Sequence, residues 1–219
     1  MSIALSLGNN LTTGGIFKPA AVNNTSVNNV TDFASVTGSS TLVLLSTQTA
    51  SASANISFTT GIDSTYDEYI FKFINIHPAT DNVQFLFNFS TDGGSNYNVT
   101  KTSTYFHPFH DEADTVTALG YFISGDLAQS TSYQQIVNQI GNDNDQTVSG
   151  TMHLFEPSST TFVKHFICTS NFYAYNDYTQ NAYVAGYGNT TSAINAIDFK
   201  VSSGNIDDGI IKMYGVAKS

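Results

Sequence analysis

Apolar and polar residues alternate along most of this chain, and the alternation is densest between residues 56 and 105. In that stretch, aromatic and β-branched residues recur with a period of two, which is typical of strands that bury one face. The alternating positions are Tyr69, Phe71, Phe73, Val83, Phe85 and Phe87. Residues 77–82 and 92–96 separate the runs with Pro, Gly, Asp and Asn, which favour turns. The pattern therefore predicts adjacent antiparallel strands.

Twelve short strands are predicted in all, with Gly, Asn, Asp, Ser or Pro at nearly every junction. They cover residues 41–46, 52–58, 68–76, 82–90, 97–105, 117–123, 133–140, 147–155, 161–169, 181–187, 196–202 and 209–216. No convincing helical pattern is present beyond a turn near residues 124–130. Strands with one apolar face must pack as two sheets or a closed barrel to hide those faces. We therefore expect an all-β protein, with a jelly-roll-like antiparallel β-sandwich over residues 41–219.

Residues 1–40 follow a different pattern, in which scattered apolar residues are separated by Gly and Asn without a sustained period. Such a segment buries too little surface on its own to offset the entropy of ordering it. It is therefore either a disordered leader or an extended N-terminal arm that orders against a partner. Alternation at the start favours the arm, because an alternating segment can add a strand to a neighbour's sheet. The expected arm contacts are Ile3, Leu5, Leu7, Ile16 and Phe17.

The charge balance excludes one class of partner. All seven basic residues are lysines, against seventeen acidic residues, and the formal net charge is −10. Nucleic-acid binding requires clustered cations, usually with arginine for its bidentate contacts to phosphate. We therefore expect no nucleic-acid partner. An acidic surface rich in Asn, Thr, Ser and Gly instead suits a protein that stays soluble at high local concentration.

The sequence has no strong signal for a membrane span, for secretion or for a disulfide bond. No apolar run approaches the length needed to span a bilayer, and the first residues lack the basic and apolar regions of a secretory signal. We therefore expect no membrane association. The single cysteine, Cys168, cannot form an internal disulfide, and its apolar neighbours predict a buried strand position.

Two clusters contain side chains that could bind a metal ion. Residues 107–112 hold His107, His110 and two carboxylates, which are suitable ligands. However, their spacing matches no established site and Pro108 restricts how the two imidazoles could converge, so an exposed loop is the interpretation we favour. Residues 141–146 begin like a calcium loop but lack its central glycine and later glutamate, which favours a polar hairpin turn. We expect no metal and no cofactor.

Enzymatic motifs are not evident. The chain has no Gly-x-Ser-x-Gly motif, and nothing singles out a pair of carboxylates for glycoside hydrolysis. We therefore expect a protein that is not an enzyme.

A group of tyrosines, interleaved with Asn and Asp, has the composition of a sugar-binding surface. Its members are Tyr173, Tyr175, Tyr178, Tyr183 and Tyr187. The absence of tryptophan weakens this interpretation. Cross-strand structural pairs, or a contact between subunits, explain the group more readily.

Six segments carry a resemblance to a known family. They are ISFTTGIDSTYDEYIFKFINIHPATDN (56–82), FSTDGGSNYN (89–98), LFEPSSTTFVKH (154–165), VAGY (184–187), NTTSAINA (189–196) and SSGNI (202–206). With these segments the chain resembles a recurrent domain in virion proteins of tailed bacteriophages, particularly marine phages, where it occurs in tail-fibre, head-fibre and other structural proteins. The resemblance covers about residues 42–216. Members sit at different places on the particle, and the region corresponding to residues 1–40 normally determines where the domain docks.

The resemblance implies a non-enzymatic virion structural protein. A tail fibre normally carries a long shaft or attachment domain, and about 40 residues leave little room for either. We therefore expect a capsid decoration (cement) protein on the outer shell, which forms a homotrimer and binds the major capsid protein or another virion protein through its arm. The alternative is a tail-fibre, head-fibre or collar module that binds host surface glycans through exposed loops. The candidate recognition residues of those loops are His107, His110, Tyr173, Tyr175 and Tyr178.

Overall fold

The computed structural model describes residues 42–217, and all regular structure in this range is β. In chain order the strands are β1 (Leu42–Thr49), β2 (Ile56–Phe58), β3 (Glu68–Pro78), β4 (Val83–Ser90), β5 (Lys101–Asp111), β6 (Thr117–Tyr121), β7 (Gln134–Ile140), β8 (Val148–Phe155), β9 (Lys164–Ala174), β10 (Tyr178–Gly188), β11 (Ala196–Val201) and β12 (Ile206–Val216). The predicted arm, residues 1–40, lies outside the described residues.

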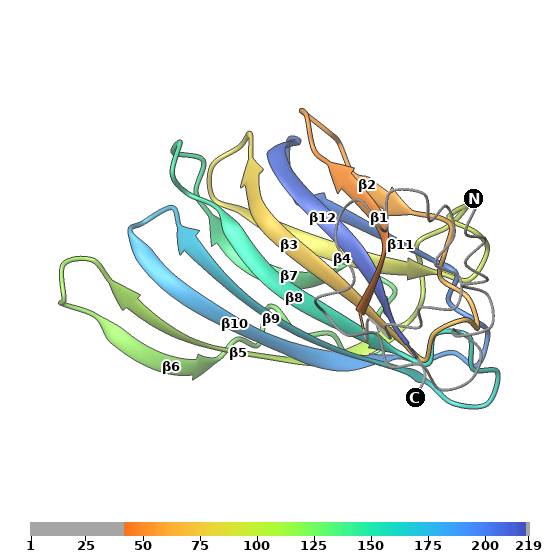
Figure 1. The fold of residues 1–219 in the computed structure, drawn as a ribbon. Coiled ribbons are helices and arrows are strands. Elements are labelled where there is room, and N and C mark those ends of the chain that lie inside the picture. Colours follow the sequence, from red (N-terminus) through yellow and green to blue (C-terminus); the bar gives the residue numbers. More distant parts are fainter. Residues whose placement is uncertain (1–41, 218–219) are drawn as a thin grey trace, which may run out of the picture. The chain divides into compact units, whose positions relative to one another are not determined.

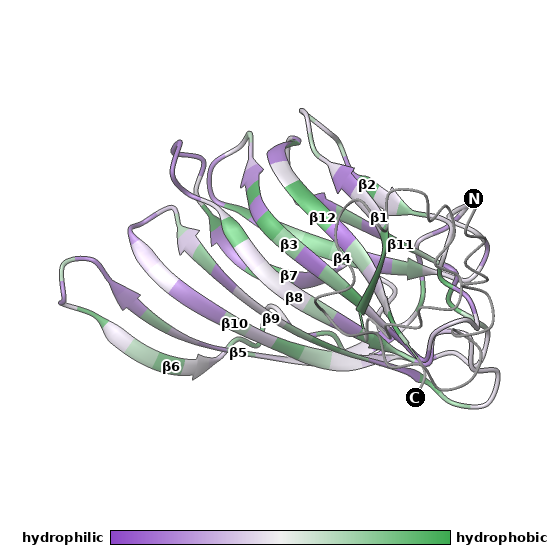
Figure 2. Ribbon diagram, in the orientation of Figure 1, coloured by the Kyte–Doolittle hydropathy of each residue, from purple (hydrophilic) through white to green (hydrophobic). Residues whose placement is uncertain are grey.

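The strands form two antiparallel layers (Figure 1). One layer has the order β1-β12-β3-β8-β9-β10-β5-β6, and the other has the order β7-β4-β11-β2. A single residue pair, Ile140 with Ala174, links the two layers through β7 and β9. Buried and more exposed positions alternate along most of β3 and β12, which gives each strand one inward and one outward face. The hydropathy of both strands changes along their length in Figure 2.

Eight strands follow a jelly-roll path, in which β1-β12-β3-β8 faces β2-β11-β4-β7. The chain therefore alternates between the layers, and the first strand lies beside the last. The other four strands are two hairpin insertions, β5–β6 after β4 and β9–β10 after β8. Because β10 pairs with β5, the insertions together widen the first layer beyond β8. The predicted jelly-roll-like β-sandwich is confirmed.

The core between the layers is built from aromatic side chains. Phe199 on β11 lies at its centre, with its ring centroid 5.3 Å from that of Phe73 and 5.6 Å from that of Phe71. Phe87 and Phe166 meet across the layers at 5.1 Å. The alternating residues identified in the sequence are all buried, namely Tyr69, Phe71, Phe73, Val83, Phe85 and Phe87. Their period of two thus marks the inner faces of β3 and β4.

The predicted turn at residues 92–96 is confirmed. The Asp92 carboxylate accepts hydrogen bonds from the Ser90 hydroxyl (2.6 Å) and the Asn96 backbone amide (2.9 Å). These bonds favour the charged form and lower the pKa of Asp92 to about 2. Gly93 and Gly94 follow with φ of 72° and 89°, a region that favours glycine.

The boundaries of β5 differ from the prediction. A strand was expected at residues 97–105, but β5 covers Lys101–Asp111 and includes the segment expected to be an exposed loop. Pro108 argued for a loop because it has no amide hydrogen. In the structure, β5 pairs with β10 at Phe106 and Phe109 but not at the two residues between them. The ladder to β10 is therefore interrupted where Pro108 cannot donate, while pairing with β6 continues.

Candidate functional site

Strand pairing brings together two stretches that the sequence analysis singled out separately. Thr179 on β10 is paired on one side with His110 on β5 and on the other side with Tyr173 on β9. These three residues therefore form a lateral row on the outer face of the wide layer. Two of them, His110 and Tyr173, are predicted recognition residues.

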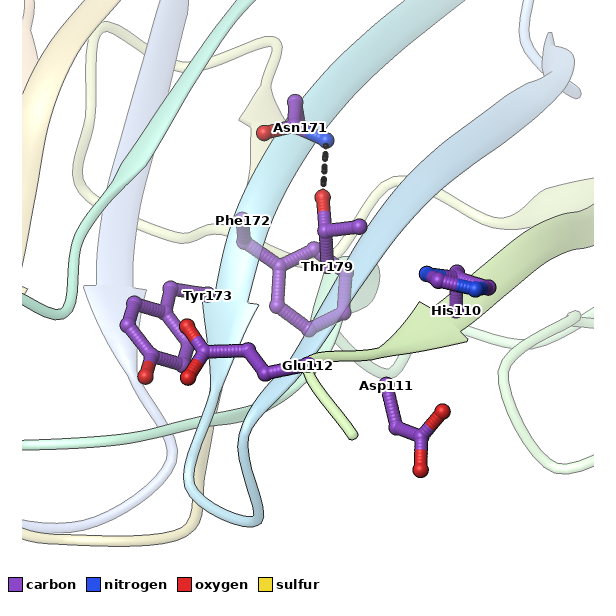
Figure 3. Close-up of a pocket in the computed structure, with 7 residues that line it drawn as sticks. All are labelled: His110, Asp111, Glu112, Asn171, Phe172, Tyr173 and Thr179. Atoms are coloured by element: carbon purple, nitrogen blue, oxygen red, sulfur yellow. Dashed lines mark hydrogen bonds between the residues drawn. The ribbon is translucent and has the colours of Figure 1, made fainter. Parts of the chain in front are cut away.

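A shallow hollow of about 350 Å³ lies over this row, and we call it the outer hollow (Figure 3). It is lined by His110, Asp111, Glu112, Asn171, Phe172, Tyr173 and Thr179. The Asn171 side-chain amide donates to the Thr179 hydroxyl at 3.1 Å, and His110 Nε2 lies 3.1 Å from Asp114 Oδ1. Most of the residues that line the outer hollow are thus polar or charged.

Two acidic side chains, those of Asp177 and Glu112, interact with the Tyr173 hydroxyl. It donates to Asp177 Oδ1 at 3.3 Å, and its ring lies beside the Glu112 side chain (Figure 3). Hydrogen bonding to Glu112 is the main cause that raises the pKa of the Tyr173 phenol above its usual range. Tyr173 is therefore a neutral hydrogen-bond donor at physiological pH and not a nucleophile.

His107 and His110 do not belong to one site, because side chains three residues apart on a strand point to opposite faces of the sheet. His110 is exposed on the outer face, whereas the His107 side chain is buried, with only 9% of its surface exposed. The prediction of an exposed loop is therefore wrong for His107. Its ring packs between Tyr105, Phe109 and Phe122, at centroid distances of 5.3–5.6 Å. Burial lowers the pKa of His107, so its imidazole is neutral near pH 7.

A second cavity of about 270 Å³ lies at the inner face of the same strands, and we call it the inner pocket. It is lined by His107, Phe109, Phe122, Asn138, Gln139, Asn176, Tyr178 and Gln180. Within residues 42–217, His107 Nδ1 and Gln180 Oε1 are buried and have no hydrogen-bond partner. The inner pocket thus contains polar atoms that the fold itself does not satisfy.

The tyrosines considered from the sequence as a sugar-binding surface are largely engaged in contacts between neighbouring strands. Tyr183 stacks on Phe106, with ring centroids 4.9 Å apart and planes 8° from parallel. Tyr178, the first residue of β10, meets Phe109 edge to face at 5.7 Å. Tyr175 lies in the β9–β10 turn with 39% of its surface exposed. Structural pairing, the interpretation favoured from the sequence, accounts for Tyr178 and Tyr183.

Sequence reasoning missed six of the eight residues that line the inner pocket, namely Phe109, Phe122, Asn138, Gln139, Asn176 and Gln180. They come from separate parts of the chain, and the pairing of β10 with β5 and of β7 with β9 brings their strands together. The one available signal was Gln180 itself, a polar residue at the inward position of an alternating strand. A buried polar side chain of this kind needs a partner.

No three His, Cys, Asp or Glu side chains among residues 42–217 are grouped so that they could hold a metal ion. Cys168 is buried, and burial raises the pKa of its thiol to about 12, which keeps it in the unreactive thiol form. None of the described segments is a helix long and apolar enough to cross a membrane.

The predicted arm contacts, Ile3, Leu5, Leu7, Ile16 and Phe17, lie outside the described residues. Comparison of the chain with family models, curated proteins and solved structures finds no match.

Proposed function

We propose that this protein is a non-enzymatic structural protein of a bacteriophage virion, and specifically a decoration protein on the outer capsid shell. The observation that carries the proposal is a patch of exposed apolar side chains on the outer face of the wide layer. It consists of Phe106, Leu119, Tyr121, Ile167 and Tyr183, whose exposed fractions range from 37% to 70%. Contiguous exposed apolar side chains are typical of surfaces that bind other proteins.

Three residues of the exposed apolar patch are contiguous across strands. Tyr121 on β6 is paired with Phe106 on β5, and Phe106 stacks on Tyr183 of β10. We propose that this patch contacts sister copies in a homotrimer, while residues 1–40 bind the major capsid protein or another virion protein. Closed symmetry is the rule for homo-oligomers, and many copies on one shell share the binding energy. The sequence resemblance to virion proteins of tailed phages supports the same role.

The number of copies per particle tests the decoration role. Quantitative mass spectrometry of purified virions, normalised to the major capsid protein, should give hundreds of copies, because a decoration protein occupies repeated sites over the whole shell. A count of about a dozen to a few tens would contradict this role, since closed symmetry at a tail or vertex offers few sites.

Deleting residues 1–40 should abolish binding to particles that lack the protein, while the sandwich still folds. The physical reason is that the proposed arm contacts lie in this segment and the core strands begin at Leu42. Co-sedimentation with particles measures binding, and circular dichroism checks the fold. Retained binding by a folded deletion variant would disprove the arm hypothesis.

A second candidate function is recognition of host surface glycans by a tail-fibre, head-fibre or collar module. The specific observation in its favour is the row of His110, Thr179 and Tyr173, which gathers recognition residues predicted from separate stretches. Amide and hydroxyl groups beside aromatic rings are suitable for sugar contacts. A low copy number on the particle would favour this function over decoration.

A further inference from the structure

The inner pocket contains two buried polar atoms without partners among residues 42–217, His107 Nδ1 and Gln180 Oε1. Only 9% of the surface of His107 and 5% of that of Gln180 is exposed. Buried polar atoms in folded proteins are nearly always paired, and leaving one unpaired is unfavourable. Both atoms belong to residues that line the same cavity. This combination is expected of a site whose hydrogen bonds are completed by a ligand.

The walls of the inner pocket combine aromatic rings with amides. Phe109 and Tyr178 meet edge to face at 5.7 Å, and the Phe122 ring lies 5.3 Å from the His107 ring. Such rings offer apolar surface to the C–H groups of a ligand. The amide side chains of Asn138 and Gln139 also line the cavity. The ligand should therefore have both apolar and hydrogen-bonding faces.

The charge of the site restricts the ligand further. Apart from the His107 imidazole, which burial keeps neutral, no acidic or basic side chain is among the residues that line the inner pocket. A charged ligand would lose hydration without gaining an opposite charge, which is strongly unfavourable in a partly buried site. The ligand that fits is therefore neutral.

We propose that the inner pocket binds a neutral saccharide through a single sugar ring. A hydroxyl group both donates and accepts, so one can donate to Gln180 Oε1 and another can pair with His107 Nδ1 in either tautomer of the ring. The C–H face of the sugar packs on the aromatic walls. The volume of about 270 Å³ lies just below the usual range for ligand pockets and suits one ring.

This inference shares the ligand class of the second candidate function, a sugar, but goes beyond it, because it places the sugar in the inner pocket and not in the outer hollow. It does not depend on attachment to a capsid. The experiment therefore uses the purified full-length protein alone, so that its failure is distinguishable from failure of the virion role.

Saturation-transfer NMR tests the site, with glucose, galactose, mannose and N-acetylglucosamine as probes. We expect at least one sugar to receive saturation from the wild-type protein. Gln180→Met removes the unpaired acceptor but keeps the length of the side chain, and should weaken binding by about tenfold or more. Its melting temperature should not fall, because the substitution removes an unpaired polar atom.

Gln135→Met is the matched control. Gln135 Oε1 is likewise buried without a partner in the described part of the chain, but Gln135 does not line the inner pocket. This variant should bind sugar as the wild type does. Tyr178→Leu is a second test variant, at a half-buried position, and should also weaken binding through loss of its ring. No signal from any of the four sugars, or equal binding by wild type and folded Gln180→Met, would overturn the proposal and leave water as the occupant.

Discussion

Replacing Phe199 with alanine should lower the free energy of unfolding by about 3–5 kcal/mol, the range for truncating a buried aromatic side chain. Phe199 is fully buried on β11 and contacts rings from both layers of the sandwich. These rings belong to Phe58, Phe71, Phe73, Phe85 and Phe87. The substitution therefore opens a cavity that several neighbours would have to fill at once. Urea denaturation followed by circular dichroism measures the effect.

The matched control for Phe199 is Phe162, an aromatic residue before β9 with 71% of its surface exposed. Phe162→Ala should change the free energy of unfolding by less than about 0.5 kcal/mol, because little apolar surface is buried there. A loss below about 1 kcal/mol for Phe199→Ala would show that the aromatic cluster is not what holds the layers together.

Stability should rise with pH above neutrality because of Lys101. Its side chain is fully buried, and Nζ donates to Asn88 Oδ1 and to the Val99 carbonyl at 2.8 Å. Neither acceptor carries a negative charge, so burial lowers the pKa of Lys101 to about 7. In the unfolded chain the pKa returns to about 10.4.

The sign follows from the difference in bound protons. Between these two pKa values the unfolded chain holds a proton on Lys101 that the folded chain lacks, so the free energy of unfolding increases with pH. The slope from this group approaches about 1.4 kcal/mol per pH unit within the interval. Below pH 7 both states are protonated, and the contribution no longer changes.

The measurement compares wild-type protein with Lys101→Met between pH 7 and 8.5. Above that range Cys168 makes the free energy of unfolding fall with pH. Burial raises the pKa of its thiol to about 12 in the folded state, so the thiol of the unfolded chain ionises first. Lys101→Met should remove the additional slope, whereas Lys72→Met, at a half-buried position on β3, should keep it. Equal slopes for wild type and Lys101→Met would show that the buried amine does not titrate in this range.

The sequence pattern was sufficient for the fold class and for most inward positions. Tyr69, Phe71 and Phe73 have inward positions in the structure because a period of two depends only on strand geometry. The segment around His107 and Pro108 could not be assigned locally. Pro108 favours a loop by itself, and only its place between the paired residues of β5 and β10 makes it compatible with a strand.

The candidate sites were predictable only in part. Tyr173 and His110 were identified from composition, yet their meeting across Thr179 depends on the register of two inserted hairpins, which no local pattern encodes. The inner pocket was not predicted at all. His107 was identified only as part of an expected exposed loop, and its role beside Gln180 comes from burial without a partner, which only the packed structure reveals.

The pairing of β1 with β12 determines when this protein can finish folding. Leu42 is paired with Val216, so the strand at the edge of the wide layer obtains its hydrogen-bonding partner from the far end of the chain. During synthesis on the ribosome, β1 must wait until β12 has emerged from the exit tunnel. Contacts this distant in sequence close slowly, and unpaired strands are prone to aggregate in the meantime. Folding of the sandwich can therefore be completed only after β12 has left the ribosome, and its yield should depend on chaperones that shield nascent strands.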